Sequence, residues 1–453
     1  MNIFLYQKNI LKKISDFFII NKKEYLKNII SNKYYLSTWQ AGLGRDYVEK
    51  IIFNKKNWKE IFIKKFKNKL FDYLLKQYLH KNKKIKFKNY KYICISWAFK
   101  DDFSLDGEFH DRYTKTNSRC CPNSIWILLV DKKEMPNKYD ENILLISNDY
   151  SLKYFLNNIF TDLKRKFSNQ SEDKSINTLS TNYKKYKVIK DAINMVIKNN
   201  PIDIVFTPYE AHPYQVGFFS NIHNNFKNIK TIGYIHSSLP ALPTEYCFRE
   251  GSPKILLTHG LSQKKILTNL LNWDKKKIFN INSLRYKINN SLKRDCIYLP
   301  YFLENENLIF REFETLAFNN SELLNFNKLL LRNHPAMKKS RIHNEFIKEL
   351  KNLINKIKKQ TKKNTQNFGY PIVIGASAVI VELLELGYDV FHITPKPLFD
   401  VYSPLIWDDI KVKKLSPNTF IYKILTKNKL IKRDSKNQRL HDIFAKISSI
   451  VEM

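Results

Sequence analysis

The feature that most constrains the fold is an alternation of short apolar runs with amphipathic stretches between residues 202 and 281. Four runs have the composition of buried β-strands, and they cover residues 202–207, 231–238, 254–260 and 278–281. Strands that alternate with helices form a parallel sheet with helices on both faces. The pattern therefore predicts a doubly wound α/β unit.

A second unit of the same kind is predicted from Cys296 onward. Its strand-like runs cover residues 296–299, 328–335, 371–377, 389–394 and 410–412, and the stretch from Ala378 to Leu386 is a predicted helix that Gly387 ends. Earlier runs at 92–97, 125–130 and 142–146 complete the first unit, and apolar residues recur at helical spacing before residue 89. We predict a helical region (1–89) and two Rossmann-like domains (90–290 and 291–453) that face each other across a cleft.

Composition narrows the class of protein. The chain of 453 residues is 43% hydrophobic and 14% aromatic, which is too apolar for a disordered chain, and it has no apolar run long enough to span a membrane. We find no signal peptide pattern and expect a cytoplasmic protein. The net charge of +36 is spread along the chain, so we expect no specific nucleic-acid partner, although the excess could attract the protein to the anionic inner membrane surface. The five cysteines form no metal-binding pattern.

The strand ends of the second unit carry residues suited to a phosphate. Arg332 and His334 close one strand, with Pro335 behind them, and Gly375, Ala376 and Ser377 form a turn into the next helix, where Glu382 follows. Small residues before a helix leave backbone N–H groups free to bind an anion. We predict that this group binds a nucleotide, although such turns also occur in α/β domains without a ligand.

Glu210, His236 and Gly260 each follow a predicted strand of the first unit. Glu210 comes after a proline and could act as a general base, or it could simply cap a helix. A second carboxylate, Asp106, lies in an acidic and aromatic loop at 101–113 that could contact sugar hydroxyls or be a solvated surface loop. A loop at 37–45, with two glycines, is a further candidate near an acceptor or a plain turn.

Several motifs are absent from the sequence. It has no Walker A motif, no G-x-G-x-x-G that opens a βαβ unit, and no D-x-D between apolar runs that would hold a metal and a nucleotide-sugar. We therefore expect a reaction that needs no metal and no cofactor.

Taken together, the chain resembles glycosyltransferases of the GT-B type, in particular those of bacterial capsule and lipopolysaccharide biosynthesis. The segments that carry the resemblance are 209–215, 232–238, 334–335 and 375–377 with Glu382. The His-Pro pair and the serine turn are also similar to sialyltransferases and Kdo transferases, which implies that His334 contacts and Ser377 holds a CMP phosphate. In sialyltransferases a paired-acidic segment ending in glycine supplies the base, and Leu105-Asp106-Gly107 matches it only in part, so the base is Glu210 or Asp106.

These observations predict a glycosyltransferase that moves a sugar from a nucleotide-activated donor to a surface-polysaccharide acceptor. The donor could be a CMP-linked acidic sugar, and the acceptor a glycan or a lipid-linked glycan. The residue pattern leaves open a sugar-nucleotide epimerase of the same fold, a non-catalytic factor in surface-glycan assembly, and a nucleic-acid-binding protein, which the charge alone would favour.

Overall fold

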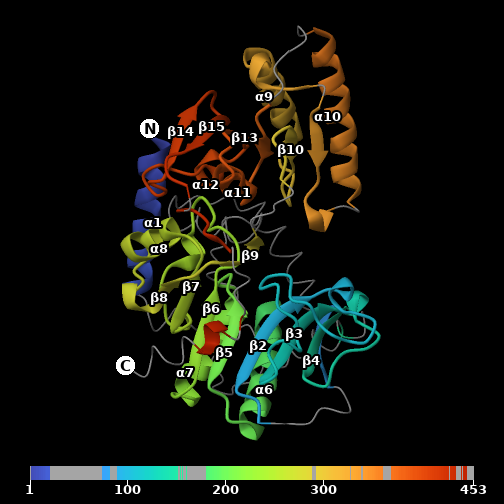
Figure 1. Cartoon of the computed structure of the whole chain (residues 1–453), viewed down its shortest axis with the longest axis vertical. Helices are drawn as coiled ribbons and strands as arrows, with labels where there is room; N and C mark the ends of the chain where they lie inside the picture. Colours follow the sequence, from blue (N-terminus) through green and yellow to red (C-terminus); the bar gives the residue numbers. More distant parts are fainter. Residues whose placement is uncertain are drawn as a thin grey trace.

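The computed structural model describes residues 2–20, 74–81, 89–150, 180–287, 292–326, 328–337, 340–360, 369–427 and 429–434, with a few residues in 154–160 and 440–445. Two α/β units follow one another along the longest axis of the molecule (Figure 1). The prediction of a mixed α/β fold with two Rossmann-like units is confirmed.

The first unit is built on an eight-stranded sheet with the order β1-β4-β3-β2-β5-β6-β7-β8. Every neighbouring pair is parallel except β1 and β4 at the edge. The strand order reverses between β2 and β5, and ligands bind at such a switch point, outside the carboxyl ends of the strands. The strands are β1 (Leu75–Lys81), β2 (Tyr92–Ala98), β3 (Ser124–Asp131), β4 (Ile143–Tyr150), β5 (Ile204–Pro208), β6 (Lys230–Tyr234), β7 (Ile255–Thr258) and β8 (Ile278–Asn280).

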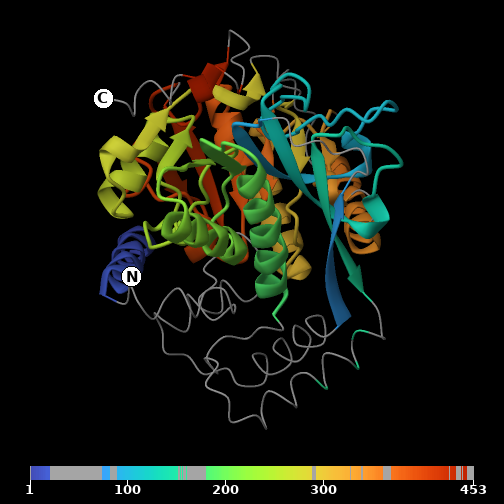
Figure 2. The ribbon, with the colours of Figure 1, turned by 90° about the horizontal axis from the view of Figure 1, so that it is seen from below.

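Both faces of this sheet are covered, which explains why its strands are continuous apolar runs. Ile125 and Ile127 of β3 belong to the cluster that includes α6 (Thr181–Asn199) and α7 (Pro213–Asn225). Trp126 of the same strand belongs to a second cluster on the other face, which takes in residues from the 99–121 loop and from the C-terminal segment. Figure 2 shows α6 and α7 against one side of the sheet.

The second unit has a six-stranded sheet with the order β11-β10-β12-β13-β15-β14. The first four strands are parallel to one another, and β15 is antiparallel to both of its neighbours, β13 and β14. Its order reverses between β10 and β12. The elements are β10 (Cys296–Tyr298), α9 (Glu306–Asn319), β11 (Leu330–Arg332), α10 (Arg341–Gln360), β12 (Ile372–Ile374), α11 (Val379–Glu385), β13 (Val390–Ile393), α12 (Pro397–Asp400), β14 (Ile410–Lys414) and β15 (Thr419–Ile424).

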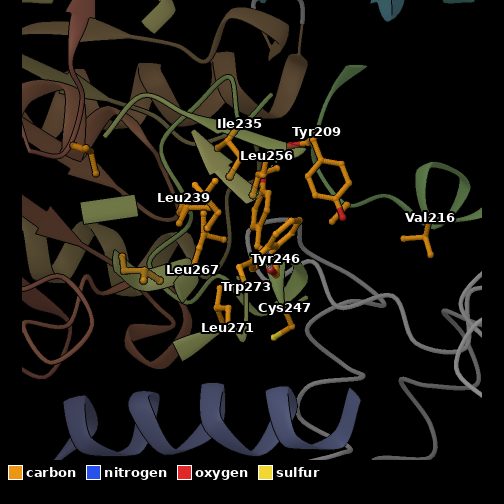
Figure 3. Close-up of a cluster of buried hydrophobic side chains, with 14 of the residues drawn as sticks. Tyr209, Val216, Ile235, Leu239, Tyr246, Cys247, Leu256, Leu267, Leu271 and Trp273 are labelled. Atoms are coloured by element: carbon orange, nitrogen blue, oxygen red, sulfur yellow. Dashed lines mark hydrogen bonds between the residues drawn. The ribbon is translucent and has the colours of Figure 1, made fainter. Parts of the chain in front are cut away.

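The two units share a continuous core on one side, where α1 (Ile3–Ile20) and α8 (Leu261–Leu270) lie. Gln7 of α1 donates from Nε2 to the carbonyl oxygens of Leu398 and Val401, at 2.8 Å each. Ser262 of α8 donates to Asp409 at 2.5 Å. A close-up of this core around Tyr209, Leu239, Tyr246 and Trp273 is given in Figure 3.

A third, two-stranded sheet pairs β9 (Ser283–Lys287) with β16 (Arg433–Asp434). In Figure 1, β9 lies between the two units. Short 3-10 helices complete the connections; they are η1 (Lys100–Asp102), η2 (Lys132–Glu134), η3 (Thr244–Tyr246), η4 (Lys275–Lys277), η5 (Ser321–Leu323) and η6 (Pro335–Met337).

Strand β1 differs from the helix expected before residue 89. Leu75 and Gln77 are buried at alternate positions, and β1 pairs antiparallel with β4, so strand pairing rather than helical spacing decides this segment. Strands β9, β15 and β16 were also not predicted. The loop at 37–45 lies outside the described residues. Among the helices that the structure describes, none combines the length and the apolar character needed to cross a membrane.

Candidate functional site

The switch point of the first sheet carries a half-buried carboxylate held by two histidines. Glu210 follows β5, and its side chain is 17% exposed. His212 Nε2 lies 2.8 Å from Glu210 Oε2, and His236 Nε2, after β6, lies 3.3 Å from Oε1. Burial by itself would raise the pKa of Glu210, but the hydrogen bond from His212 and the nearby charges of His212, His236 and Arg285 outweigh it and lower the pKa. Glu210 is therefore ionised at neutral pH.

The backbone around Glu210 is fixed by buried polar contacts. Ala211 has a positive φ of 55°, a conformation that costs a non-glycine residue ~1–2 kcal/mol. Gln215, which is 1% exposed, accepts hydrogen bonds at Oε1 from the N–H groups of Glu210 and His212, at 3.1 Å each. Arg249 donates to the Ala211 carbonyl at 3.0 Å. These contacts hold Glu210 and His212 facing each other.

Aromatic rings surround this carboxylate. The Tyr113 ring is 4.6 Å from the His236 ring, and Trp97, on β2, is 5.4 Å from Tyr113 and 5.8 Å from His212. Burial lowers the pKa of His236 to about 4, against the opposing charge of Glu210, so His236 is neutral at pH 7. A neutral imidazole can donate one N–H to Glu210. We refer to Trp97, Tyr113, Glu210, His212 and His236 as the Glu210 cluster.

The acidic loop reaches the Glu210 cluster through Tyr113. Asp111 is buried and accepts hydrogen bonds from Ser96 Oγ at 2.8 Å and from Thr114 Oγ1 at 2.5 Å, which anchors the turn that presents Tyr113. Asp106 instead is exposed and pairs with Arg119 at 2.5 Å. The hydrogen bond from Ser104, followed by that from Arg119, lowers the pKa of Asp106 to about 2. The contacts of Asp106 are thus made within its own loop and to Arg119, and not to the Glu210 cluster.

The switch point of the second sheet is formed by the Gly375 turn, which comprises Gly375, Ala376 and Ser377. Gly375 has a φ of +61°, and a Cβ added to it would lie 3.2 Å from Pro300 Cγ, at the end of the neighbouring strand β10. The Gly375 carbonyl accepts a hydrogen bond from His392 Nε2 at 2.9 Å. Ala376 and Ser377 are half-buried, and Ser377 Oγ accepts from the N–H of Val379 at 3.3 Å.

His334 lies after β11, and its ring meets that of Tyr301 edge-on at 5.3 Å. Burial, followed by the charges of His343 and Arg285, lowers the pKa of His334, so its ring is neutral at pH 7. Arg332 is exposed, with its guanidinium carbon 6.0 Å from the centre of the Tyr298 ring.

Glu382 and Gly260 have structural partners. The half-buried Glu382 side chain is hydrogen-bonded to Tyr286 of β9. At Gly260, a Cβ would meet the Leu430 carbonyl oxygen at 1.9 Å, so glycine is required for the approach of the C-terminal segment. That packing accounts for Gly260 without a ligand.

Sequence reasoning missed Arg285 on β9, because it lies in no motif and follows no strong strand signal. The charge of Arg285 lowers the pKa of Glu210 and of His334. The pKa of Arg285 itself is raised, first by Tyr286 and then, against the lowering effect of burial, by Glu382. Leu284, next to it, donates from its N–H to Tyr234 Oη at 3.0 Å, at the end of β6. Arg285 therefore lies within electrostatic range of candidate residues on both sheets.

Comparison with known proteins adds little. No family model matches the chain, and no curated protein matches it. Among solved structures, the apo structure of OtsA is similar with a TM-score of 0.28 and 11% identity, over 65% of this chain and 76% of OtsA. At this TM-score the similarity supports no conclusion about the protein.

The arrangement can support acid–base chemistry beside a bound anion. Glu210 is an ionised carboxylate with lone pairs left after its two histidine contacts, and it can accept a proton from a hydroxyl. The Gly375 turn and His334 present small residues and a neutral imidazole, which can donate a hydrogen bond. No group of three or more His, Cys, Asp or Glu side chains in the described parts of the chain could hold a metal ion.

Proposed function

We propose that the protein is a glycosyltransferase that moves a sugar from a nucleotide-activated donor to a surface-glycan acceptor, free or lipid-linked, without a metal. The observation that carries the proposal is strand β9, which contacts both units: the Leu284 N–H donates to Tyr234 Oη at the end of β6 at 3.0 Å, and Tyr286 is hydrogen-bonded to Glu382, which follows the Gly375 turn. A reaction that joins two substrates needs an acceptor group and a donor group beside each other. The Glu210 cluster is the proposed acceptor group, and the Gly375 turn with His334 is the proposed donor group.

Glu210 is the proposed base. Transfer of a sugar to a hydroxyl releases the hydroxyl proton, and an ionised carboxylate can take it as the new bond forms. The histidine contacts orient the carboxylate and leave lone pairs for a substrate hydroxyl. Trp97 and Tyr113 offer apolar ring surface to the carbon-bound side of an acceptor sugar.

The Gly375 turn and His334 are the proposed donor side. Gly375, Ala376 and Ser377 keep bulky side chains away from the backbone, which lets a phosphate approach closely. A neutral His334 can donate one hydrogen bond to the phosphate oxygen as the sugar leaves. Exposed Arg332 lies beside this position and could add positive charge.

We further propose that the protein acts at the cytoplasmic, anionic face of a membrane. The net charge of +36 supports this, as do five exposed lysines on α10 at positions 348, 351, 356, 358 and 359. Basic side chains near an anionic surface contribute ~1 kcal/mol each. Co-sedimentation with phosphatidylserine vesicles at low salt, but not with phosphatidylcholine vesicles, is expected.

The proposed function is tested by a transfer assay. The purified chain is incubated with labelled CMP-, UDP-, GDP- or TDP-sugars and with deacylated surface glycan or membrane extract, and labelled glycan is measured. Wild type and the control Glu345→Gln, on the exposed face of α10, should produce labelled glycan at similar rates, whereas Glu210→Gln should produce it at least ~100-fold more slowly. If no donor yields labelled glycan, or if Glu210→Gln matches wild type, the proposed function is wrong.

A further inference from the structure

Lys185 lies in the first turns of α6, at the carboxyl edge of the first sheet. Its neighbour Lys184 donates from Nζ to the Leu75 carbonyl at 2.8 Å, and Leu75 pairs with the last residue of β4. A Cβ added to Gly217 of α7 would lie 2.7 Å from the Tyr186 ring of α6, so the two helices approach each other closely here. Lys185 is therefore placed at the edge where a doubly wound sheet binds its ligands.

The Lys185 ammonium is linked to the proposed base by a chain of aromatic contacts. Lys185 Nζ lies 5.0 Å from the centre of the Tyr214 ring, and that ring stacks on the His212 ring at 5.3 Å, with an angle of 13° between the planes. His212 Nε2 in turn lies 2.8 Å from Glu210 Oε2. Lys185 thus borders the Glu210 cluster, although it follows no strand and belongs to no motif.

Lys185 has no anionic partner in the part of the chain that the structure describes. Its half-buried side chain makes neither a hydrogen bond nor an ion pair there. Burial lowers the pKa of Lys185 to about 8, so most of the side chains are still charged at pH 7. A cation–π contact recovers only part of the hydration that a buried ammonium loses, and a bound anion would recover more of it.

The anion that fits this position is a single carboxylate. One ammonium carries one positive charge, and it binds oxygen as a point charge, without the planar fork that an arginine offers to a phosphate. Two stacked rings lie between Lys185 and Glu210 along the chain of contacts. The carboxylate and the reacting hydroxyl therefore belong to different positions of the bound acceptor.

We infer that Lys185 binds a carboxylate of the acceptor, so that the acceptor glycan carries an acidic sugar, such as a uronic acid, at its reacting end. The inference rests on the proposed function, because it assigns the acceptor class of that same site. It concerns the first unit alone and is independent of the donor.

Ligand-detected NMR with small sugars tests the inference without a donor and without transfer. The methyl glycosides of glucuronic and galacturonic acid differ from those of glucose and galactose only in a carboxylate that replaces a hydroxymethyl group. Wild type should bind at least one uronoside ~10-fold or more tightly than its neutral counterpart. Equal binding of both acidic sugars and their neutral counterparts would overturn the inference, and so would tighter binding of a hexose monophosphate than of either uronoside.

Three variants show whether Lys185 carries the preference. Lys185→Met keeps the unbranched apolar stem and removes the charge, so the preference for the uronoside should be lost while the neutral sugar binds as before. Lys185→Arg keeps the charge and should keep the preference, which separates loss of charge from loss of packing. The control Lys190→Met removes another α6 lysine over a tyrosine ring, 5.7 Å from the centre of Tyr186, and should bind like wild type. A preference retained in Lys185→Met, or lost equally in Lys190→Met, would overturn the inference.

The inference and the proposed function fail in different ways. Uronoside binding that depends on Lys185, in a protein that transfers no sugar, would retain the acidic-sugar site and remove the transferase. Transfer to a neutral glycan at equal rates by wild type and Lys185→Met would retain the transferase and overturn the inferred acceptor class.

Discussion

Both sheets reverse their strand order once, and each has a candidate group at that point, but the two groups are built differently. At the first switch point, side chains hold Glu210 in position. His212 and His236 contact its carboxylate, and Gln215 and Arg249 bind the backbone of residues 210–212. At the Gly375 turn, the shape of the site is set by the backbone, through the positive φ of Gly375 and the close approach of Pro300.

The two groups should therefore tolerate different substitutions. A side-chain network loses function when a donor or acceptor is removed, even if volume is kept. A backbone turn loses function when volume is added, even if no polar group is lost. The proposed roles follow the same division, with proton transfer in the first unit and close binding of a phosphate in the second.

The largest effect is expected from the carboxylate at the first switch point. Glu210→Gln keeps the shape and removes the base, so turnover should fall ~10²- to 10⁴-fold with donor affinity nearly unchanged. Asp106→Asn is the matched comparison, because Asp106 is exposed and paired with Arg119, and steady-state kinetics should show turnover near wild type. A dead Asp106→Asn beside an active Glu210→Gln would make Asp106 the base.

The next effect concerns added volume at the second switch point. Gly375→Val places a branched side chain at a φ of +61° and against Pro300, so nucleotide binding should be lost and stability reduced by about 1–2 kcal/mol. Ala376→Gly is the control, since it adds no volume. Calorimetry should find binding in the control and none in Gly375→Val; normal binding in both would move the donor site elsewhere.

A smaller effect is expected from Gln215, which positions the base without touching a substrate. Gln215→Leu removes the oxygen that accepts hydrogen bonds from the N–H groups of Glu210 and His212, at ~1–3 kcal/mol for each bond lost. Turnover should fall about 10-fold with the donor KM unchanged. Gln7→Leu removes another buried glutamine that joins α1 to the second unit, and it should lower stability but not turnover. Equal turnover losses in both variants would show that Gln215 acts only through stability.

The smallest effect is a pH dependence of stability from His236. Its folded pKa of about 4 lies below the value of ~6.5 for an unfolded histidine, so the unfolded chain binds the proton more readily between these values. The free energy of unfolding should therefore fall as pH falls from 6.5 to 4. His236→Gln should reduce that slope in urea titrations without abolishing it, because His223, His259 and His392 also have lowered pKa values. His110→Gln, with a side chain 55% exposed, should leave the slope unchanged. Glu210, with a lowered pKa, adds a loss only at lower pH.

Much of the fold could be predicted from sequence because most strands of the sheets are buried on both faces and are therefore continuous apolar runs. Strand β1 was not predicted, because it is an edge strand in which only alternate residues are buried. Strands β9 and β16 are short and gain their pairing from distant parts of the chain. Such contacts leave little local pattern in the sequence.

The candidate site was predictable where residues follow strands. Parallel strands bring their carboxyl ends to one edge, so Glu210 and His236 could be expected to meet, as could Gly375 and the end of β10. Arg285 and Gln215 were not predictable in this way. Their importance depends on which atoms they contact or leave unpaired, and that appears only once the chain is folded.

In the proposed mechanism, the first switch point activates the acceptor and the second binds the donor. Thermal stabilisation by UDP, GDP, TDP and CMP tests it most directly when wild type, Glu210→Gln and Gly375→Val are compared in one experiment. We expect one nucleotide to raise the melting temperature of wild type and of Glu210→Gln equally, by an amount that corresponds to ~2.7 kcal/mol when the nucleotide is at 100 times its Kd. The melting temperature of Gly375→Val should not change. A shift retained in Gly375→Val, or lost in Glu210→Gln, would contradict it.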